Sequence, residues 1–534
     1  MGIYKLRTDF ATHLKVLLWI VLVIFVVGAI WSFGAAPFLR NAKKKETVIL
    51  VSERPVHRSD YDAEWERYYK LAQQNGMKSP LEFANLKQMI IENMINSQKL
   101  ISVCESEGIV ITKKDIKAAK EEKIVEALKI NRNAIMGDLD EAEENLDPRK
   151  DKKFLKTLSE NGMSIDSIIS DANANVSDLS VKAELCQKKM QEKVDAKTKD
   201  LTKDDVKNSY KSYSVNQINI SEDKTTPEEA KANADKAYAE LKAGGDFEKV
   251  KAKYTSVNGF PGMKYNPIDM PWFLPAKVGS AVQNLSEGQY TEVIKSDKNY
   301  YIVKVDKITD EAPKNLDEKT VNERKEQIKQ SVQQQIFGEL QEKMDAIKEI
   351  DVKDPEFRGY YHCILAEREN TPEAAKGEYS KAAECFTEAL KKEEQIGKDV
   401  INAKLADIYF KTEDYKQCCD TLYAMLDGKE STTEAYDLRA LYGDALAKTG
   451  QKDKAIEQYR QAAMLNKVDA AFLDEISEKL TGLGDKADAA SAKAQAEEIR
   501  AYEAKQQAEF MKQQEQAAKA QAKKDKAENK DAKK

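Results

Sequence analysis

The longest apolar stretch of the chain covers residues 16–36 and contains no charged side chain. At about 1.5 Å per helical residue it would reach roughly 30 Å, which is the thickness of the hydrocarbon core of a bilayer. A cleaved signal peptide is the alternative, although the run is long for such a segment and no small-x-small site ends it. The pattern predicts a transmembrane helix at residues 16–36, preceded by a short segment of residues 1–15.

Helical spacing of apolar residues dominates the chain from residue 46 onward. Apolar side chains three and four apart predict amphipathic helices over most of residues 46–211, which we expect to form one helical module. A further apolar stripe runs along a predicted helix in residues 316–352. A lone amphipathic helix is not stable in water, so this helix is expected to dock on the earlier module and complete it. The stripe consists of Ile328, Val332, Ile336, Leu340, Met344 and Ile347.

Residues 212–310 show a different pattern. Residues 213–221 have the alternating side-chain faces of a β-strand, and residues 300–305 form a second predicted strand. Between them lie two predicted helices separated by Gly244 and Gly245, and an irregular segment with four prolines. The pattern predicts a compact α+β domain inserted into the helical module.

Three segments within residues 360–482 superpose on one another. Ala382, Cys418 and Ala455 take equivalent positions, at separations of 36 and 37 residues. A small residue at such a position lets two helices approach closely, which predicts three stacked helix pairs with a capping helix. The following segment, residues 487–534, is rich in Ala, Lys and Gln, and is expected to be a solvated helix or a disordered tail.

Charge and composition narrow the classes of function. Charged residues make up 33% of the chain, and the net charge of −6 shows no basic excess, so nucleic-acid binding is not expected. The three histidines form no ligand constellation, and the six cysteines show no CxxC spacing. We therefore predict no metal and no cofactor, and we expect the cysteines to be buried free thiols.

Several segments resemble known families. VSERPVHRSDYDAEW, at residues 51–65, lies shortly after the predicted anchor and resembles the opening of SurA- and PpiD-like bacterial folding factors. GGDFEKVKAKYT, LSEGQYTEVI and YYIVKV resemble the parvulin-type peptidyl-prolyl isomerase domain. The C-terminal repeats resemble tetratricopeptide (TPR) motifs.

The resemblance implies a mainly α, multidomain protein of a bacterial cytoplasmic (inner) membrane. A single transmembrane helix precedes a SurA-like helical chaperone module with an inserted parvulin-like α+β domain, and a C-terminal TPR α-solenoid follows. The residues before the anchor are then cytoplasmic, and the C-terminal body is extracytoplasmic, in the periplasm. Positive charges flank the anchor on both sides and do not decide this orientation by themselves.

The parvulin resemblance also points to an unusual isomerase site. Parvulin domains usually carry a histidine in the first strand and another in the last, and these places fall on Gln217 and Tyr301. The family's Cys or Asp after the second helix falls on Val257. Rotation of an X–Pro bond crosses a barrier of about 18–20 kcal/mol, and a catalyst must stabilise the twisted amide. Since these three residues do not reproduce a pair of imidazoles, we expect a degenerate site with weak or absent isomerase activity.

The irregular segment of the same domain offers an apolar surface. Met270, Trp272, Phe273 and Leu274 are predicted to contact client polypeptides. The alternative interpretation is that these side chains form the core and rim of the domain.

Three functions are compatible with these features. The first is a membrane-anchored folding factor that holds unfolded or nascent exported polypeptides in a cradle made by the helical module and the helix of residues 316–352. The second is an active parvulin-type isomerase with a rearranged site. The third is an adaptor whose TPR repeats recruit a membrane complex. The predicted partners are unfolded polypeptides and, in addition, a protein bound in the TPR groove.

Overall fold

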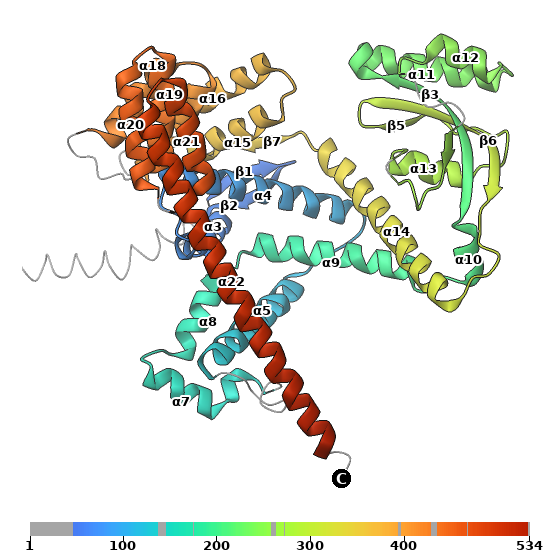
Figure 1. Cartoon of the computed structure of the whole chain (residues 1–534). Coiled ribbons are helices and arrows are strands. Elements are labelled where there is room, and N and C mark those ends of the chain that lie inside the picture. The colour runs from blue at the N-terminus through green and yellow to red at the C-terminus, as the bar shows by residue number, and fades with distance from the viewer. Residues whose placement is uncertain are drawn as a thin grey trace, which may run out of the picture. The chain divides into compact units, whose positions relative to one another are not determined.

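The computed structural model describes residues 46–531, except for 137–145, 175, 258–262, 272, 393–396, 429–434 and 467 (Figure 1). The protein is mainly helical and multidomain, and its described strands form two small sheets. The predicted transmembrane segment, residues 16–36, lies outside the described part. None of the described helices is both long and apolar enough to cross a membrane. Residue contacts divide the chain into two compact units, and their boundary passes through α4 (Pro80–Ser106).

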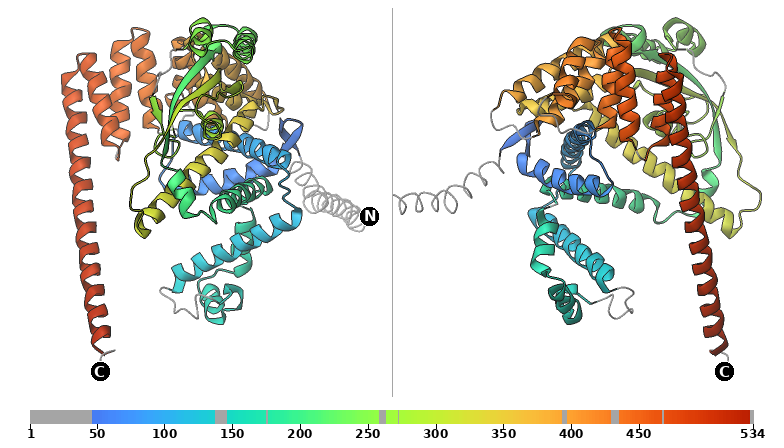
Figure 2. Two further views of the ribbon diagram at one scale, coloured as in Figure 1. Left: turned by 90° about the vertical axis from the view of Figure 1, so that its right-hand side faces the viewer. Right: turned by 60° about the vertical axis from the view of Figure 1, so that its left-hand side comes forward.

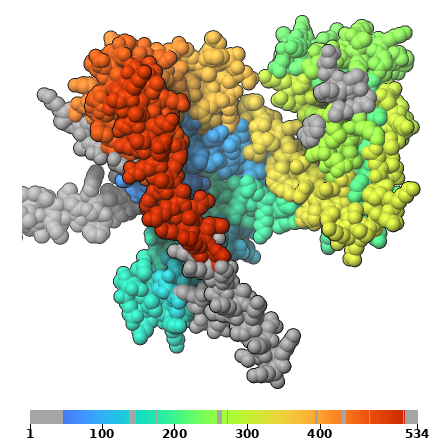
Figure 3. Space-filling model, in the orientation of Figure 1, coloured from blue at the N-terminus to red at the C-terminus, as the bar shows by residue number. Residues whose placement is uncertain are grey.

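The first unit comprises, among the described residues, 46–49, 57–93 and 352–531. It contains α3 (Arg58–Gln74), the first half of α4, and a row of helices in which each packs against the next. In the space-filling view the last helices of this row form one continuous packed surface (Figure 3). The row consists of α15 (Pro355–Arg368), α16 (Pro372–Leu390), α17 (Lys398–Lys411), α18 (Tyr415–Leu426), α19 (Tyr436–Lys448), α20 (Lys452–Leu465), α21 (Ala470–Gly482) and α22 (Lys486–Asp531).

Small residues bring the two helices of each pair together in this row. The equivalent positions Ala382, Cys418 and Ala455 are fully buried. Gly443 in α19 lies against the Tyr459 ring of α20, and a Cβ atom added at Gly443 would come within 2.5 Å of that ring. The stacked helix pairs therefore follow the predicted repeat, while their assignment to the TPR family stays a prediction.

Of the two alternatives for the C-terminal segment, the structure shows the helix. α22 continues as a single long helix to Asp531 (Figure 2). Its first turns are anchored, because Ala489, Ala492 and Ala496 lie in the core of the last helix pair. Farther along, Tyr502 is 64% exposed and Phe510 57% exposed, so these two side chains have little packing within the unit.

The second unit comprises residues 50–56 and 94–351, apart from the undescribed positions. It holds the second half of α4, further helices of the helical module, and the predicted α+β domain. Its elements are α5 (Lys113–Met136), η2 (Pro148–Lys150), α7 (Lys152–Glu160), α8 (Ile165–Ala174), α9 (Asp178–Thr198), α10 (Lys203–Asn208), β3 (Lys211–Ser221), η3 (Glu222–Lys224), α11 (Pro227–Lys242), α12 (Phe247–Tyr254), β4 (Met263–Tyr265), α13 (Ala276–Gln283), β5 (Ile294–Ser296), β6 (Asn299–Asp310) and α14 (Glu318–Ala346).

The helix α14 begins as predicted but ends earlier. The Asp317 carboxylate caps its first turn by accepting a hydrogen bond from the Thr320 N–H at 2.8 Å. The prediction of one helix through residue 352 is wrong, because Ile350–Val352 is the strand β7. This strand belongs to a sheet of order β2-β1-β7, with β1 (Thr47–Val51) and β2 (Arg54–His57). Its pairing partner stands at the other end of the described chain, where no helical pattern in residues 316–352 could indicate it.

The α+β domain is a four-stranded antiparallel sheet of order β4-β3-β6-β5, covered by helices on both faces (Figure 1). Ile218 and Ile220 of β3 pack with residues of α11 and α12 on one face. Val215 and Val303 pack with α13 residues on the other. Both faces are buried because successive side chains of a strand point to opposite sides, and here both sets are covered.

Candidate functional site

Two of the predicted site residues lie on the same face of the domain sheet. In the β3–β6 register, Asn219 stands opposite Tyr301 and Gln217 stands opposite Val303. Because residues two apart in a strand share a face, Gln217, Asn219 and Tyr301 all lie on the side covered by α13. The alternation that placed Gln217 on this face also indicated Asn219, which sequence reasoning did not single out as a site residue.

The side chains of this group are polar and neutral, with Asn219 buried and Gln217 and Tyr301 partly buried. The Oε1 atom of Gln217 and the Oδ1 atom of Asn219 are buried and have no hydrogen-bond partner among the described residues. Burial raises the pKa of Tyr301 above its usual 10, although the hydrogen bond from the Asn219 amide acts in the opposite direction. An amide does not titrate, so the group carries no charge change at physiological pH. It offers hydrogen-bond acceptors and a phenol, and no proton-exchanging pair.

Val257, the third predicted site residue, contacts Asn219 through its backbone. The N–H groups of Ser256 and Val257 both donate to the Asn219 carbonyl, at 2.9 and 3.3 Å. The Ser256 hydroxyl accepts a hydrogen bond from the Ser221 N–H at 2.8 Å. The segment after α12 is thereby fixed on the end of β3, and Val257 contributes no side-chain polar atom there. The structure thus brings Gln217, Val257 and Tyr301 together around Asn219.

The predicted client-binding residues take different places. Leu274 is 3% exposed and belongs to the core between the sheet and α13, in line with the alternative interpretation for this residue. Met270 and Phe273 are partly buried and pack against the same core. The Phe273 ring lies 5.7 Å from the Tyr265 ring, between centroids. Trp272 lies outside the described residues, so client contact at this segment stays a prediction.

The segment that carries Met270 is tied to α14 by a buried arginine. Arg324 is 3% exposed, and its guanidinium donates to the Asp269 carboxylate at 2.5 and 3.2 Å. It also donates to the Ser209 hydroxyl at 2.9 Å and to the Ser209 carbonyl at 2.7 Å. The Tyr210 ring lies 4.2 Å from the guanidinium carbon. These contacts fix the entry to β3 and the irregular segment on one helix of the helical module.

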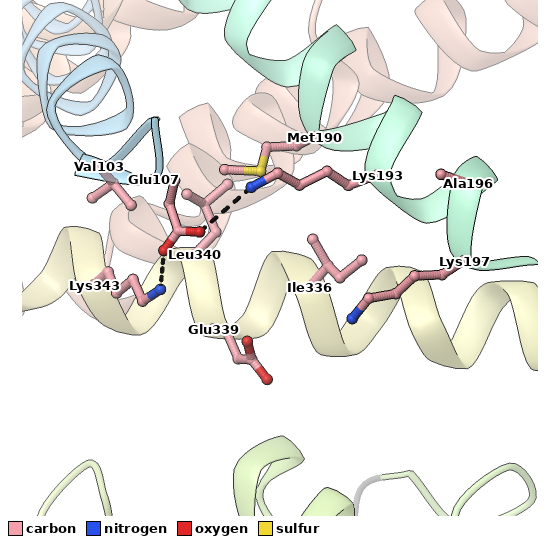
Figure 4. Close-up of a pocket in the computed structure, with 10 residues that line it drawn as sticks. All are labelled: Val103, Glu107, Met190, Lys193, Ala196, Lys197, Ile336, Glu339, Leu340 and Lys343. Atoms are coloured by element: carbon pink, nitrogen blue, oxygen red, sulfur yellow. Dashed lines mark hydrogen bonds and ion pairs between the residues drawn. The ribbon is translucent and has the colours of Figure 1, made fainter. Parts of the chain in front are cut away.

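A cavity of about 390 Å³ lies in the helical module where the end of α4, α9 and α14 meet (Figure 4). Met190 and Leu340, on α9 and α14, are 3% and 7% exposed and form part of its apolar wall. Two residues of the predicted apolar stripe, Ile336 and Leu340, therefore line a pocket on the helix that contacts α9. The pocket is lined by Val103, Glu107, Met190, Lys193, Ala196, Lys197, Ile336, Glu339, Leu340 and Lys343.

Ion pairs close one end of this pocket. The Glu107 carboxylate accepts hydrogen bonds from Lys343 of α14 and from Lys193 of α9, the latter at 3.4 Å (Figure 4). The hydrogen bond from Lys343 is the main reason that the pKa of Glu107 lies below its usual 4.5. The two lysines compensate the carboxylate, and the rest of the lining combines apolar side chains with Lys197 and Glu339. The arrangement suits an apolar side chain entering between the helices, with charged groups at the rim.

The described residues hold no cluster of three or more His, Cys, Asp or Glu side chains with the geometry of a metal site. All six cysteines are free and buried, as expected. The candidate site consists of two parts, the polar face of the domain sheet and the helical pocket.

Comparison with known families identifies two domains in the chain. Residues 3–133 match the model of the SurA-like N-terminal domain, and residues 181–319 match the model of the PPIC-type PPIase domain. The chain thus carries a SurA-like domain followed by a PPIC-type domain, the order that is typical of folding factors of the SurA/PpiD type, which it resembles.

Its relatives include foldases. The chain is 32% identical over 169 residues to the foldase protein PrsA of Geobacillus sp. (strain WCH70), an alignment that covers 29% of this chain and 55% of the relative. The match thus spans about half the length of that relative.

Solved structures give weaker likenesses. Foldase protein PrsA from Streptococcus pneumoniae is 17% identical, with 58% of this chain and 97% of that chain covered and a TM-score of 0.18. MamA (41-end) from Desulfovibrio magneticus RS-1 is 19% identical over 28% of this chain and 86% of that chain, with a TM-score of 0.21. At these TM-scores neither superposition supports a conclusion about function.

Proposed function

We propose that this protein is a membrane-anchored extracytoplasmic folding factor that binds unfolded or newly exported polypeptides in the pocket between α4, α9 and α14. The pocket itself is the observation on which this proposal depends, because it combines apolar walls with a compensated charged end. Unfolded chains expose apolar side chains, and burying one of them contributes about 1.5–3 kcal/mol. The foldase relative supports the same class of client.

Membrane anchoring belongs to the proposal as well. The apolar run of residues 16–36 would hold the protein in the cytoplasmic membrane of a bacterium, with the body on the periplasmic side. Protease added to intact spheroplasts would then digest the body and spare the residues before the anchor. Protection of the body would contradict this orientation.

The parvulin-like domain is proposed to bind polypeptide without efficient isomerisation. Gln217, Asn219 and Tyr301 supply hydrogen-bonding groups at the usual site but no imidazole. A catalyst must favour the twisted amide over the planar one, whereas a binding surface need only accept the peptide. The domain would thus add a second contact surface to the helical pocket.

Client binding can be tested with a substitution that introduces a charged side chain into the pocket wall. Ile336 is half-buried in α14, so Ile336→Asp changes the pocket with limited effect on the core. Losing about 2 kcal/mol of apolar contact corresponds to roughly thirtyfold weaker binding of an unfolded test protein. Fluorescence anisotropy and aggregation suppression measure this on the purified full-length chain in detergent.

The matched control is Ile130→Asp, since Ile130 is also on a helix of this unit and is 63% exposed. It should leave binding unchanged. If the wild type, Ile336→Asp and Ile130→Asp bound the unfolded test protein with equal affinity, the pocket would not be the client-binding site.

An active prolyl isomerase is the second candidate, favoured by the PPIC-type match at residues 181–319. A proline-peptide isomerisation assay separates the two. Turnover well above the uncatalysed rate that is lost in Gln217→Ala or Tyr301→Phe would establish the enzyme. We expect each substitution to change the measured rate by less than about twofold, because a neutral amide and a phenol do not replace the imidazole pair.

A further inference from the structure

The first half of α4 makes polar contacts with three helices of the repeat row. The Ser79 hydroxyl donates to Asp437 of α19 at 2.6 Å. Lys404 of α17 donates to the Asn85 side-chain carbonyl at 3.0 Å. Lys87 pairs with Glu356 of α15 at 2.6 Å. Each contact is with the first helix of a pair. As the residue number rises from Ser79 to Lys87, the contacted helix changes from α19 to α17 to α15.

Two more contacts continue this line on α15. Gln88 donates to Glu367 at 2.8 Å, and Arg368 donates to Glu92 at 2.5 Å. From residue 79 to residue 92 a helix advances about 20 Å at 1.5 Å per residue. Packed helices stand about 8–10 Å apart, and the first helices of neighbouring pairs can also meet directly, since α17 contacts α19. Residues 79–92 therefore run along the row and meet one pair after another.

The charged groups of this contact are withdrawn from solvent. The Lys404 side chain is 2% exposed, and the side chains of Lys87 and Glu356 are each 11% exposed. Burial also raises the pKa of Asp437, against the hydrogen bond from Ser79. Buried charges are costly unless their partners are held in place, so these contacts discriminate between one fitting helix and others.

Apolar packing accompanies the polar contacts. Leu81 packs against the core cluster formed by the later helices of the row. The Phe83 ring lies 6.3 Å from Trp65 and 5.1 Å from Tyr69 of α3, between ring centroids. The helix is thus supported from its other side by α3, which itself contacts α15 through Tyr61 and Phe357.

We propose that the face formed by α15, α17 and α19 is a docking site whose ligand is the helix of residues 79–92 of the same chain. On this face the repeats act as an intramolecular clasp and not as a recruitment site. A second protein reaches the face only by displacing that helix. Such a competitor needs a hydroxyl, a carboxamide and an ammonium group, spaced as in Ser79, Asn85 and Lys87, to satisfy the buried groups of the row.

The experiment uses the purified full-length chain in detergent and a fluorescent synthetic peptide of residues 77–95. The wild type should not bind the peptide, because its own helix covers the face. Lys87→Glu places two carboxylates together at Glu356, so the resident helix should undock. Deuterium exchange of residues 79–92 should then accelerate by about tenfold or more, and the peptide, which retains Lys87, should bind.

A compensating change makes the outcome specific. Adding Glu356→Lys to Lys87→Glu restores opposite charges, so slow exchange should return and binding of the wild-type peptide should be lost. Gln88→Ala is a milder variant that removes only the contact with Glu367 and covers the case in which Lys87→Glu impairs folding. The control is Lys231→Glu, because Lys231 and Asp235 form an exposed pair at 65% and 55% exposure.

Peptide binding by the wild type as tight as by Lys87→Glu would overturn the proposal, because the face would then be open. Unchanged exchange of residues 79–92 in both Lys87→Glu and Gln88→Ala would overturn it too. Client binding at the helical pocket is read out separately with Ile336→Asp, so failure of that function leaves this result unaffected.

Discussion

The sheet face of the parvulin-like domain and the helical pocket lie in the same unit of the molecule but offer different chemical groups to a polypeptide. The sheet face gathers Gln217, Asn219 and Tyr301, which are polar, at least partly buried and uncharged at physiological pH. The pocket has apolar residues in its walls, and Lys193 and Lys343 are paired with Glu107 at one end, while Lys197 and Glu339 also line it. The first arrangement offers fixed hydrogen bonds without proton transfer, and the second offers apolar burial. This difference is the basis of the proposal that the protein holds polypeptides and does not rotate their peptide bonds.

The largest expected effect comes from cutting the connection between these regions. Arg324→Met removes the guanidinium that binds Asp269 and Ser209, while keeping a side chain of similar length. Loss of one partner of a buried charged network costs about 3 kcal/mol, and somewhat less here because Asp269 is half exposed. Deuterium exchange at residues 209–210 and 266–271 should accelerate by roughly a hundredfold.

The control for Arg324→Met is Lys329→Met on the same helix, since Lys329 forms an exposed pair with Asp195 at 2.9 Å. It should leave the exchange rates unchanged. If Arg324→Met also had no effect, the sheet face would hold its position without α14.

A steric change of intermediate size separates the sheet face from the pocket. A Cβ atom at Gly279 in α13 would overlap the Tyr265 hydroxyl. Gly279→Ala should therefore destabilise the parvulin-like domain by about 1–3 kcal/mol. Helix propensity alone predicts the opposite sign, a gain of roughly 1 kcal/mol. Denaturant unfolding followed by intrinsic fluorescence measures the change.

Removing the hydroxyl tests the cause of that effect. Tyr265→Phe in the Gly279→Ala background should recover most of the lost stability, because the overlapping atom is gone. Client binding at the helical pocket should stay within about twofold in both variants, since the pocket contains neither residue. A stabilising Gly279→Ala would show that α13 shifts to make room.

The smallest expected effect is a difference in pH response. The pKa of Glu107 is lowered chiefly by Lys343, so its folded-state value lies below the unfolded value near 4.5. The interaction is thus fully present above that unfolded value and is lost as the pH falls through the lower folded value. Exchange at residues 336–343 should accelerate in that acidic range, and Glu107→Gln should abolish this step.

The sheet face provides the contrast in the same experiment. Since the pKa of Tyr301 is raised above 10 and amides do not titrate, exchange around residues 215–219 should show no local step between pH 4 and 9. An acid step at both regions would point to general loosening of the unit and not to Glu107.

The sequence predicted local structure better than distant pairing. Alternation in residues 213–221 places Gln217 and Asn219 on one face, because the side-chain period of a strand is two. The stripe through Ile336 and Leu340 likewise predicted a helix that docks, and α14 packs against α9. The alternation does not show that the Oε1 and Oδ1 atoms lack partners, since that depends on α13 and on β6.

Contacts between residues far apart in the sequence could not be predicted from the sequence pattern, for a physical reason. The strand at Ile350–Val352 pairs with β1, and a three-residue segment with two apolar residues looks the same at the end of a helix. The pairing of Lys87 with Glu356 joins residues that no periodicity connects. The repeat pattern indicated that small residues bring helices together, but it did not indicate which helix lies against the row. Tertiary burial decides these cases, and local propensity does not.

The contact between Gly443 and Tyr459 has a consequence for how such a row can lengthen. The ring occupies the space that any larger residue at Gly443 would need, and Gly359 and Phe386 repeat the arrangement in an earlier pair. Losing the ring alone leaves a hole, and enlarging the glycine alone forces a clash. A further helix pair could therefore pack as closely as these two only if its small residue and its large partner changed together.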